Sequence, residues 1–344
     1  MKYLKQIIIF TLIFTAFLLG CTNSQQTTEE ELQDIIFRFG SSPNTKFATT
    51  YLAMDKGFYA EEGLNVKVQT VAGSTVVVKL IAAGNEEFGL ASANSILTGK
   101  SKGMPLKVLS VYFQKSPSAV IFSKDSGIKS PKDLEGKKIA SNPKSTIRQE
   151  FLAFAKNNGV DINKIKFIPV GSAAAEAQAF LNGDADAFVG YFHRAETILE
   201  DNSVTSFDKL LFDQYGNDIY SQAIFVHEDF LQSNPDLARK FLRATNKGIR
   251  YSLANPEEAV NSLVLHNPLL SKESELKKFL KMSEVVENQI TREFGIGYQT
   301  KERWEETQKL LFNLELIDTK IDIETLFTND FLSNNNIFIV EDPS

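Results

Sequence analysis

Residues 71–74 read VAGS and residues 84–89 read GNEEFG, and this arrangement recurs 98 and 99 residues later, where residues 169–172 read PVGS and residues 183–188 read GDADAF. Each copy follows the order strand, Gly-Ser, helix, Gly, acidic pair, strand. Two matched offsets of nearly equal size predict two similar α/β lobes and not one long sheet.

Outward from the repeat, short apolar runs alternate with helical patterns, which is typical of an α/β fold with largely parallel sheets. The predicted strands are 35–39, 66–71, 88–91, 108–113, 119–123, 138–141, 166–170, 187–192 and 223–226. The later part of the chain is helical, with predicted helices at 235–253, 256–265, 272–285 and 301–314. Asn234 and Asn255 each precede a Pro at a first helical position, so we expect their side chains to cap those helices.

The division into lobes follows from two crossing points. Ser116 and Pro117 separate two strand-like runs, and residues 221–226 offer a return crossing. We therefore assign residues 35–117 and 225–344 to lobe one and residues 118–224 to lobe two. A cleft between the lobes, lined by loops at the carboxyl ends of parallel strands, is the expected ligand site.

The beginning of the chain has the pattern of a targeting segment. Lys2 and Lys5 precede a short apolar run, so residues 1–20 are predicted to be a signal peptide. Cys21 follows Gly20 in an arrangement that resembles the lipobox of bacterial lipoproteins, and the resemblance implies a lipid on the Cys21 sulfur. Polar residues dominate the stretch that follows, so residues 21–34 are predicted to be a lipid-anchored flexible tether. The expected location is the extracytoplasmic face of the cell membrane, in a periplasm or at the cell exterior.

Composition excludes several classes of function. The 344 residues are 43% hydrophobic and carry one Cys and a formal net charge of −6. One Cys rules out a disulfide framework and a thiolate metal cluster, because both need at least two sulfurs. The negative charge leaves no electrostatic footprint for nucleic acid. We predict no nucleic-acid partner, no metal and no cofactor.

Polar and aromatic side chains follow the predicted strands, where free N–H groups at helix N-termini can hold ligand oxygens. For any single residue simple N-capping is the more frequent role, but several such loops converge on one cleft. Rings and amides suit a flat heterocycle. Two roles remain open for each of two further residues. Arg148 either pairs with an anionic group of the ligand or is a solvated helix residue, and His193 either contacts the ligand or is an ordinary residue of the fold. The predicted ligand-binding residues are Ser41, Asn44, Thr45, Phe47, Ser74, Thr75, Asn94, Tyr112, Asn142, Ser145, Thr146, Arg148, Tyr191, Phe192 and His193.

Several segments resemble one family of solute-binding proteins. Residues 42–45 (SPNT), 56–59 (KGFY) and 62–64 (EGL) look like its opening, and residues 130–137 (SPKDLEGK) and 328–332 (TNDFL) match further on. The family serves ABC importers for thiamine pyrimidine precursors, sulfonates, taurine and nitrate. The resemblance implies a two-lobed periplasmic-binding-protein type II fold and a monomeric lipoprotein that delivers a small molecule to an ABC permease with its ATPase. A pyrimidine thiamine precursor is the favoured ligand, and an aliphatic sulfonate, taurine or nitrate is the alternative.

The same family includes a eukaryotic enzyme branch, a pyrimidine synthase that consumes its own active-site His and carries a Cys-rich iron-binding motif. Phe47 stands here where that His is expected, and Cys21 is the only Cys. We therefore predict no catalytic residue and no enzyme activity, with an enzyme on the same fold as the remoter alternative.

Overall fold

The computed structural model describes residues 31–332. The predicted signal peptide, Cys21 and the tether as far as residue 30 lie outside this range. Residues 33–332 belong to one compact unit. Across the described range, no helix has the length and apolar character that a membrane span needs.

The first of two five-stranded sheets contains β1 (Gln33–Phe39), β2 (Leu64–Thr70), β3 (Phe88–Ser92), β4 (Leu106–Val111) and β10 (Gln222–His227). Its strand order is β2-β1-β3-β10-β4. β1 is parallel to β2 and β3, whereas β10 is antiparallel to β3 and β4. We call this sheet and the helices around it the first lobe.

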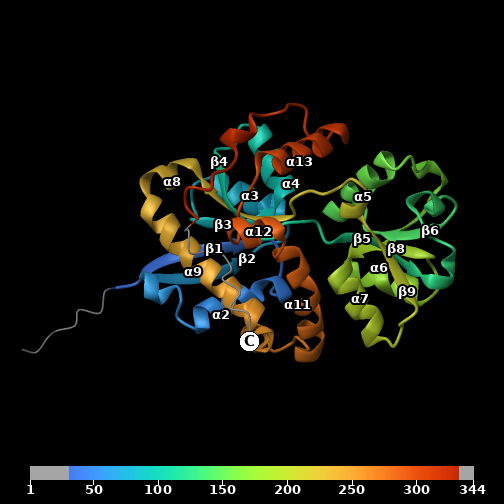
Figure 1. Ribbon diagram of the computed structural model, residues 1–344, viewed down its shortest axis with the longest axis horizontal. Coiled ribbons are helices and arrows are strands. Elements are labelled where there is room, and N and C mark those ends of the chain that lie inside the picture. Colours follow the sequence, from blue (N-terminus) through green and yellow to red (C-terminus); the bar gives the residue numbers. More distant parts are fainter. Residues whose placement is uncertain (1–30, 333–344) are drawn as a thin grey trace, which may run out of the picture. The chain divides into compact units, whose positions relative to one another are not determined.

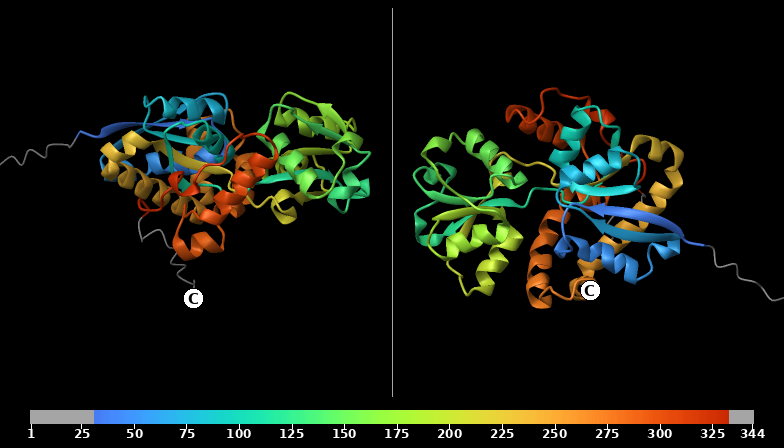
Figure 2. Two further views of the ribbon diagram at one scale, coloured as in Figure 1. Left: turned by 90° about the horizontal axis from the view of Figure 1, so that it is seen from above. Right: turned by 180° about the vertical axis from the view of Figure 1, so that it is seen from behind.

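The second sheet contains β5 (Ser118–Ser123), β6 (Lys138–Ser141), β7 (Lys166–Pro169), β8 (Ala187–Tyr191) and β9 (Phe207–Leu211). Its order is β7-β6-β8-β5-β9, with β6 parallel to β7 and β8 and with β5 antiparallel to β8 and β9. This sheet and its helices form the second lobe. Figures 1 and 2 show the two segments that run between the sheets, one from β4 to β5 and one leading into β10.

Both sheets are mixed, but four of the five strands in each sheet run in the same direction, so the prediction of largely parallel sheets is confirmed. The antiparallel strands are β5 and β10, which the chain enters from the other lobe. A strand reached in this way is not part of a βαβ crossover, and only that crossover would require it to run parallel. The sequence analysis also missed β9, an edge strand in which Asp208 and Lys209 interrupt the apolar run.

Helices cover the sheets on both sides (Figure 2). In the first lobe they are α2 (Ala48–Asp55), α3 (Ser74–Ala82), α4 (Ala93–Ser101), α8 (Glu228–Ser233), α9 (Pro235–Ala254), α10 (Pro256–His266), α11 (Lys272–Val286), α12 (Gln289–Phe294) and α13 (Lys301–Asn313). In the second lobe they are α5 (Thr146–Asn157), α6 (Ala173–Leu181) and α7 (Phe192–Asp201). The short 3-10 helices are η1 (Thr45–Phe47), η2 (Ala60–Glu62), η3 (Lys124–Ser126), η4 (Pro131–Leu134), η5 (Ile162–Lys164), η6 (Phe212–Tyr215) and η7 (Ile323–Thr325).

The four predicted late helices are confirmed as α9, α10, α11 and α13, each end within one residue. The predicted role of the Asn residues before them is wrong. Neither Asn234 nor Asn255 caps the helix that follows, and instead their Nδ2 groups donate to the carbonyls of Phe230 (3.1 Å) and Tyr251 (2.9 Å) in the helix before. Their backbone is not in the extended conformation that lets an N-cap side chain reach forward, so these amides close the preceding helix.

The acidic pairs of the repeat join neighbouring parallel strands. A Glu87 carboxylate oxygen accepts the Ile36 N–H of β1 at 2.8 Å, and an Asp186 carboxylate oxygen accepts the Lys138 N–H of β6 at 2.8 Å. Gly84 and Gly183, just before them, have φ values of 74° and 78°, which glycine adopts readily after a helix. The repeat therefore fixes the start of one strand pair in each lobe.

Candidate functional site

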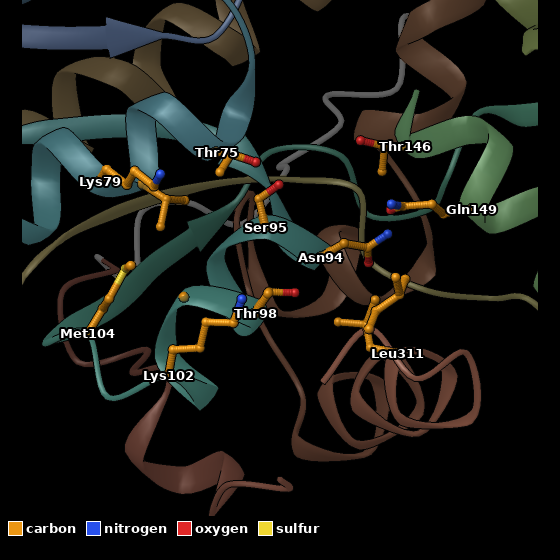
Figure 3. Close-up of a pocket in the computed structure, with 13 residues that line it drawn as sticks. Thr75, Lys79, Asn94, Ser95, Thr98, Lys102, Met104, Thr146, Gln149 and Leu311 are labelled. Carbon is orange, nitrogen blue, oxygen red and sulfur yellow. The ribbon is translucent and has the colours of Figure 1, made fainter. Parts of the chain in front are cut away.

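Loops at the ends of the strands bring residues of both lobes to two cavities. The first, which we call the Asn94 cavity, has a volume of about 230 Å³ (Figure 3). Its lining consists of Thr75, Val78, Lys79, Asn94, Ser95, Thr98, Gly99, Lys102, Met104, Thr146, Gln149, Leu311 and Leu316. Thr75, Asn94 and Thr146 are three of the predicted ligand-binding residues.

The first turns of α3, α4 and α5 meet at the Asn94 cavity, through Thr75, Asn94 and Thr146 respectively. Unpaired N–H groups at such ends attract electron-rich ligand atoms. Lys79 and Lys102 add positive charge, and the described lining contains no carboxylate. The cavity is therefore suited to a ligand with several hydrogen-bond acceptors.

Asn94 has a buried amide oxygen that lacks a partner. The residue is 6% exposed, and its Oδ1 accepts no hydrogen bond from the described part of the chain. In Figure 3 its amide lies toward Gln149 and Thr146, the residues contributed by the second lobe. An unsatisfied buried amide costs free energy, so a ligand donor at this point would be stabilising.

The second cavity, which we call the His193 cavity, has a volume of about 360 Å³. Its lining consists of Ser41, Ser42, Pro43, Asn44, Thr45, His193, Arg194, Leu270, Glu275 and Lys278. The loop after β1 is shaped locally, because Asn44 Oδ1 accepts the Lys46 N–H and Asn44 Nδ2 donates to Ser41 Oγ at 3.1 Å. The structure brings Ser41, Asn44, Thr45 and His193 together at this cavity, while the predicted residues Thr75, Asn94 and Thr146 lie at the other.

His193 lies among cations. It is 5% exposed, and its Nδ1 has no hydrogen-bond partner in residues 31–332. Burial, together with the charges of Arg194, Lys278 and Lys46, lowers the pKa of His193 to about 3. The imidazole is consequently neutral at physiological pH and offers one donor and one acceptor nitrogen.

Two carboxyl groups support the loops of the second lobe. Glu176 on α6 accepts the Asn142 N–H at 2.8 Å, and burial raises the pKa of Glu176 to about 7. Glu150 on α5 accepts hydrogen bonds from the hydroxyls of Ser116 and Ser118, each at 2.6 Å, and burial raises its pKa also. These contacts tie the crossing segment and the loop after β6 to their own lobe.

Three of the four predicted aromatic ligand residues pack in the core. Phe47 is fully buried and stacks on Phe39 at 4.0 Å between ring centroids, while Tyr112 and Phe192 are 3% and 2% exposed. These residues lie directly after a strand or at the start of a helix, where the backbone geometry directs the side chain into the core. Tyr191 alone is half-buried; its ring stacks on that of His193, with 5.9 Å between centroids, and it does not line either cavity.

The remaining predicted residues have local partners. Ser74 Oγ accepts the Ser92 N–H at 3.0 Å, and Ser145 Oγ caps α5 by accepting the Arg148 N–H at 3.2 Å. Asn142 Nδ2 donates to the Gly171 carbonyl at 3.1 Å. The Arg148 guanidinium carbon lies 3.3 Å from the centre of the Phe167 ring, so this side chain stacks within its own lobe and does not line either cavity.

Sequence reasoning missed Lys46, Gln149, Glu176 and Arg194. Arg194 directly follows the predicted ligand residue His193, and Lys46 lies between the predicted ligand residues Thr45 and Phe47. Glu176 was detectable by aligning the two repeats, because it occupies the position of the apolar Val78 in the first copy. Within residues 31–332, no three His, Cys, Asp or Glu side chains gather in a way that could hold a metal ion.

Known proteins with similar sequences include binding proteins and enzymes. The riboflavin-binding protein RibY of Chloroflexus aurantiacus is 25% identical over 90% of this chain and 88% of its own length. The formylaminopyrimidine-binding protein of Halalkalibacterium halodurans is 24% identical over 94% and 98%. The 4-amino-5-hydroxymethyl-2-methylpyrimidine phosphate synthase of Legionella pneumophila is 25% identical over 82% and 86%, so synthase relatives are not confined to eukaryotes.

The fold has close counterparts among solved structures. The periplasmic aliphatic sulphonate binding protein SsuA from Escherichia coli superposes with a TM-score of 0.69 over 85% of this chain and 91% of its own, at 14% identity. The predicted periplasmic-binding-protein fold is thereby confirmed. The family model described as NMT1/THI5 like matches residues 44–259, more than half of the sequence, and the chain therefore belongs to that family.

Proposed function

We propose that this chain is the substrate-binding lipoprotein of an ABC importer, anchored through Cys21 on the extracytoplasmic face of the membrane. One observation carries the proposal: residues from both lobes line the same cavities, so a single bound molecule can bridge them. Two named binding proteins that align with almost the whole chain support this role.

The mechanism we propose is closure about the segments that connect the sheets. A ligand that contacts Asn94 of the first lobe and Thr146 of the second, or Ser41 of the first lobe and His193 of the second, has more contacts when the lobes are closed. Its preferential affinity for that state shifts the equilibrium toward closure without any covalent step. The closed protein is then the form that the permease and its ATPase recognise.

The favoured ligand is a pyrimidine of the thiamine-precursor type. An amide such as that of Asn94 or Gln149 pairs well with the amino and ring nitrogens of a heterocycle. We assign stacking on the heterocycle to Tyr191, because it is half-buried and its ring lies beside that of His193, 5.9 Å between centroids. The names of the two binding relatives, one for riboflavin and one for a formylaminopyrimidine, favour the same ligand class.

A melting panel on residues 22–344 tests this ligand class. The compounds are hydroxymethyl-, aminomethyl- and formylaminopyrimidines, riboflavin, thiamine, taurine, alkyl sulfonates and nitrate. A ligand at 100 times its Kd stabilises the folded state by about 2.7 kcal/mol, which raises Tm by several degrees. We expect heterocycles to give this shift, Tyr191→Ala to remove it and Tyr191→Phe to retain it. If none of the heterocycles raises Tm, the ligand assignment is refuted.

A sulfonate, taurine or nitrate is the second candidate ligand. Lys79, Lys102 and three helix N-termini at the Asn94 cavity favour it, with no carboxylate in the described lining. Exclusive shifts with sulfonates in the same panel, lost in a Lys79→Gln, Lys102→Gln double variant, would replace the pyrimidine by this class.

An enzyme on the same fold is the competing function, since a synthase is among the relatives. Incubation of the purified chain with each stabilising ligand, followed by mass spectrometry of the small molecules, separates the two. Unchanged compound supports transport, whereas a new product refutes it.

The anchor has its own test. Expression of the full chain in a bacterium is expected to place it in the membrane fraction with the mass of a lipid added at Cys21. The Cys21→Ala variant should be released from that fraction. A full chain that is found in the membrane fraction with an unmodified Cys21 would contradict the lipoprotein proposal.

A further inference from the structure

Positive charge without an ion-pair partner in the described residues lies at the His193 cavity and next to it, one cation from each lobe. Arg194 on α7 lines it from the second lobe, and Lys46 on η1 directly follows the loop that lines it from the first. Neither side chain has an ion pair or hydrogen bond within residues 31–332. By contrast, Arg243 and Arg292 pair with Glu62 and Glu287 at 2.6 and 2.8 Å.

The two cations are close enough to affect each other and their neighbours. Burial and the charge of Arg194 lower the pKa of Lys46 to about 8. The same two cations, with Lys278, act on the buried imidazole of His193. Lys46 is next to Thr45 in the chain, outside the lining of the His193 cavity itself, and it lines a small cavity of about 10 Å³ beside Tyr112.

The carboxyl groups nearby do not balance this charge. Glu275 is 3% exposed and already holds Lys278 at 2.7 Å and the hydroxyl of Thr45. Glu176 interacts electrostatically with Arg194. Its carboxyl group, however, accepts the Asn142 N–H and keeps its proton up to near-neutral pH, because burial raises its pKa. Lys46 and Arg194 thus lack a counter-ion, and their repulsion opposes closure of the empty protein.

We propose that the ligand carries an acidic group, a carboxylate or phosphate, that binds between Lys46, His193 and Arg194. This inference rests on the proposed function and names the ligand more closely: a flat heterocycle with an anionic substituent. The anion accepts from the Arg194 guanidinium on one lobe and the Lys46 ammonium on the other, and the neutral imidazole of His193 contributes an N–H. By removing the repulsion between the two cations, the anion itself favours the closed state.

Three related compounds test the proposal by titration calorimetry. They are 4-amino-2-methylpyrimidines that carry hydroxymethyl, carboxyl or phosphomethyl at the same ring position. We expect the two acids to bind at least about tenfold more tightly than the alcohol, since loss of one partner of a charge pair typically costs more than a factor of ten. Arg194→Gln and Lys46→Gln should each abolish this preference, and neither should weaken the binding of the alcohol, because each removes the repulsion that opposes closure.

The matched controls are Lys79→Gln and Lys102→Gln, which remove exposed cations at the Asn94 cavity. These variants should keep the preference for acids. The unliganded Tm of each variant shows that it is folded, and Lys46→Gln should not lower it, because the substitution removes a repulsion. Equal binding of acids and alcohol, or a preference that persists in Arg194→Gln, overturns this inference and leaves the proposed function standing. Failure of all three compounds and of every other heterocycle to bind refutes both.

Discussion

The two copies of the Gly-Ser repeat have the same order of strands, turns and helices, but they differ in the side chains that face the core and the cleft. Glu87 and Asp186 make the same bond to the start of a neighbouring strand, at 2.8 Å in both lobes. At corresponding positions, however, Val78 in the first lobe is matched by Glu176 in the second. The residues that hold neighbouring strands together are therefore the same in kind in both lobes, whereas the side chains that fill the core and face the cleft differ between the lobes.

The strand that ends each repeat shows how different the packing is. Gly89 in β3 is matched by Phe188 in β8, at the same place in the two copies. Gly89 lies opposite Phe225 on β10, whereas Phe188 lies opposite Ile121 on β5. The bulky ring thus comes from the crossing strand in the first lobe and from the repeat itself in the second.

The largest expected effect is the loss of the Phe188 ring. Phe188 is 1% exposed, and its ring lies 5.4 Å from that of Phe180. We expect Phe188→Ala to lower the free energy of unfolding by about 3–5 kcal/mol, because a buried ring leaves a cavity. Urea unfolding monitored by circular dichroism measures this, with Phe188→Leu as the milder control. A loss no larger than that of Phe188→Leu would mean that the site collapses around the missing ring.

The reciprocal change, Gly89→Ala, tests the first lobe. An added Cβ would lie 2.8 Å from Phe225 Cε1 and 2.9 Å from Ile81 Cγ1, closer than side chains normally approach. We expect a loss of about 1–3 kcal/mol in the same unfolding experiment, as is usual for overpacking. Gly190→Ala in β8 is the matched control, since its Cβ would have 3.6 Å to the nearest atom and should be nearly neutral. Equal effects of the two substitutions would refute the steric account.

These packing differences mark the limit of what the sequence predicted. The repeat and the β-α alternation were enough to place every described strand except β9, because pattern and turn residues are local properties. Local pattern could not show that β5 and β10 run antiparallel, since that depends on where the chain crosses between lobes. Nor could it separate Tyr191, which is half-buried, from the fully buried Phe47.

The hydrogen bonds of Glu87 and Asp186 are equal in length, but we expect them to contribute different amounts to the free energy of unfolding. Glu87 is half-buried, whereas Asp186 is exposed and competes with water for the Lys138 N–H. We expect Glu87→Ala to cost about 1.5 kcal/mol and Asp186→Ala about 0.5 kcal/mol. Thermal unfolding of both variants in parallel measures the difference. A larger effect of Asp186→Ala would show that the second lobe, and not the first, depends on this bond.

The last comparison concerns Val78 and Glu176, because only one lobe has a titratable group at this position. Burial raises the pKa of Glu176 from 4.5 to about 7 in the folded chain, so between these values the folded state binds more protons than the unfolded state. The contribution of Glu176 to stability is therefore largest below about pH 4.5 and declines as pH rises toward 7. His193 acts in the opposite direction, since its lowered pKa makes the folded state more stable as pH rises through the range from about 3 to 6.5.

Because the two groups oppose each other, the wild-type pH profile alone is uninformative, and the difference between wild type and Glu176→Gln is the quantity to measure. Gln keeps an oxygen that can accept the Asn142 N–H but has no proton to lose. The contribution of His193 is present in both proteins and cancels. Between pH 5.5 and 7 the variant should gain about 1 kcal/mol relative to wild type, seen as a rising difference in Tm. A difference that stays constant with pH would mean that Glu176 is ionised throughout and that its charge, facing Arg194, already partly compensates the cations of the His193 cavity.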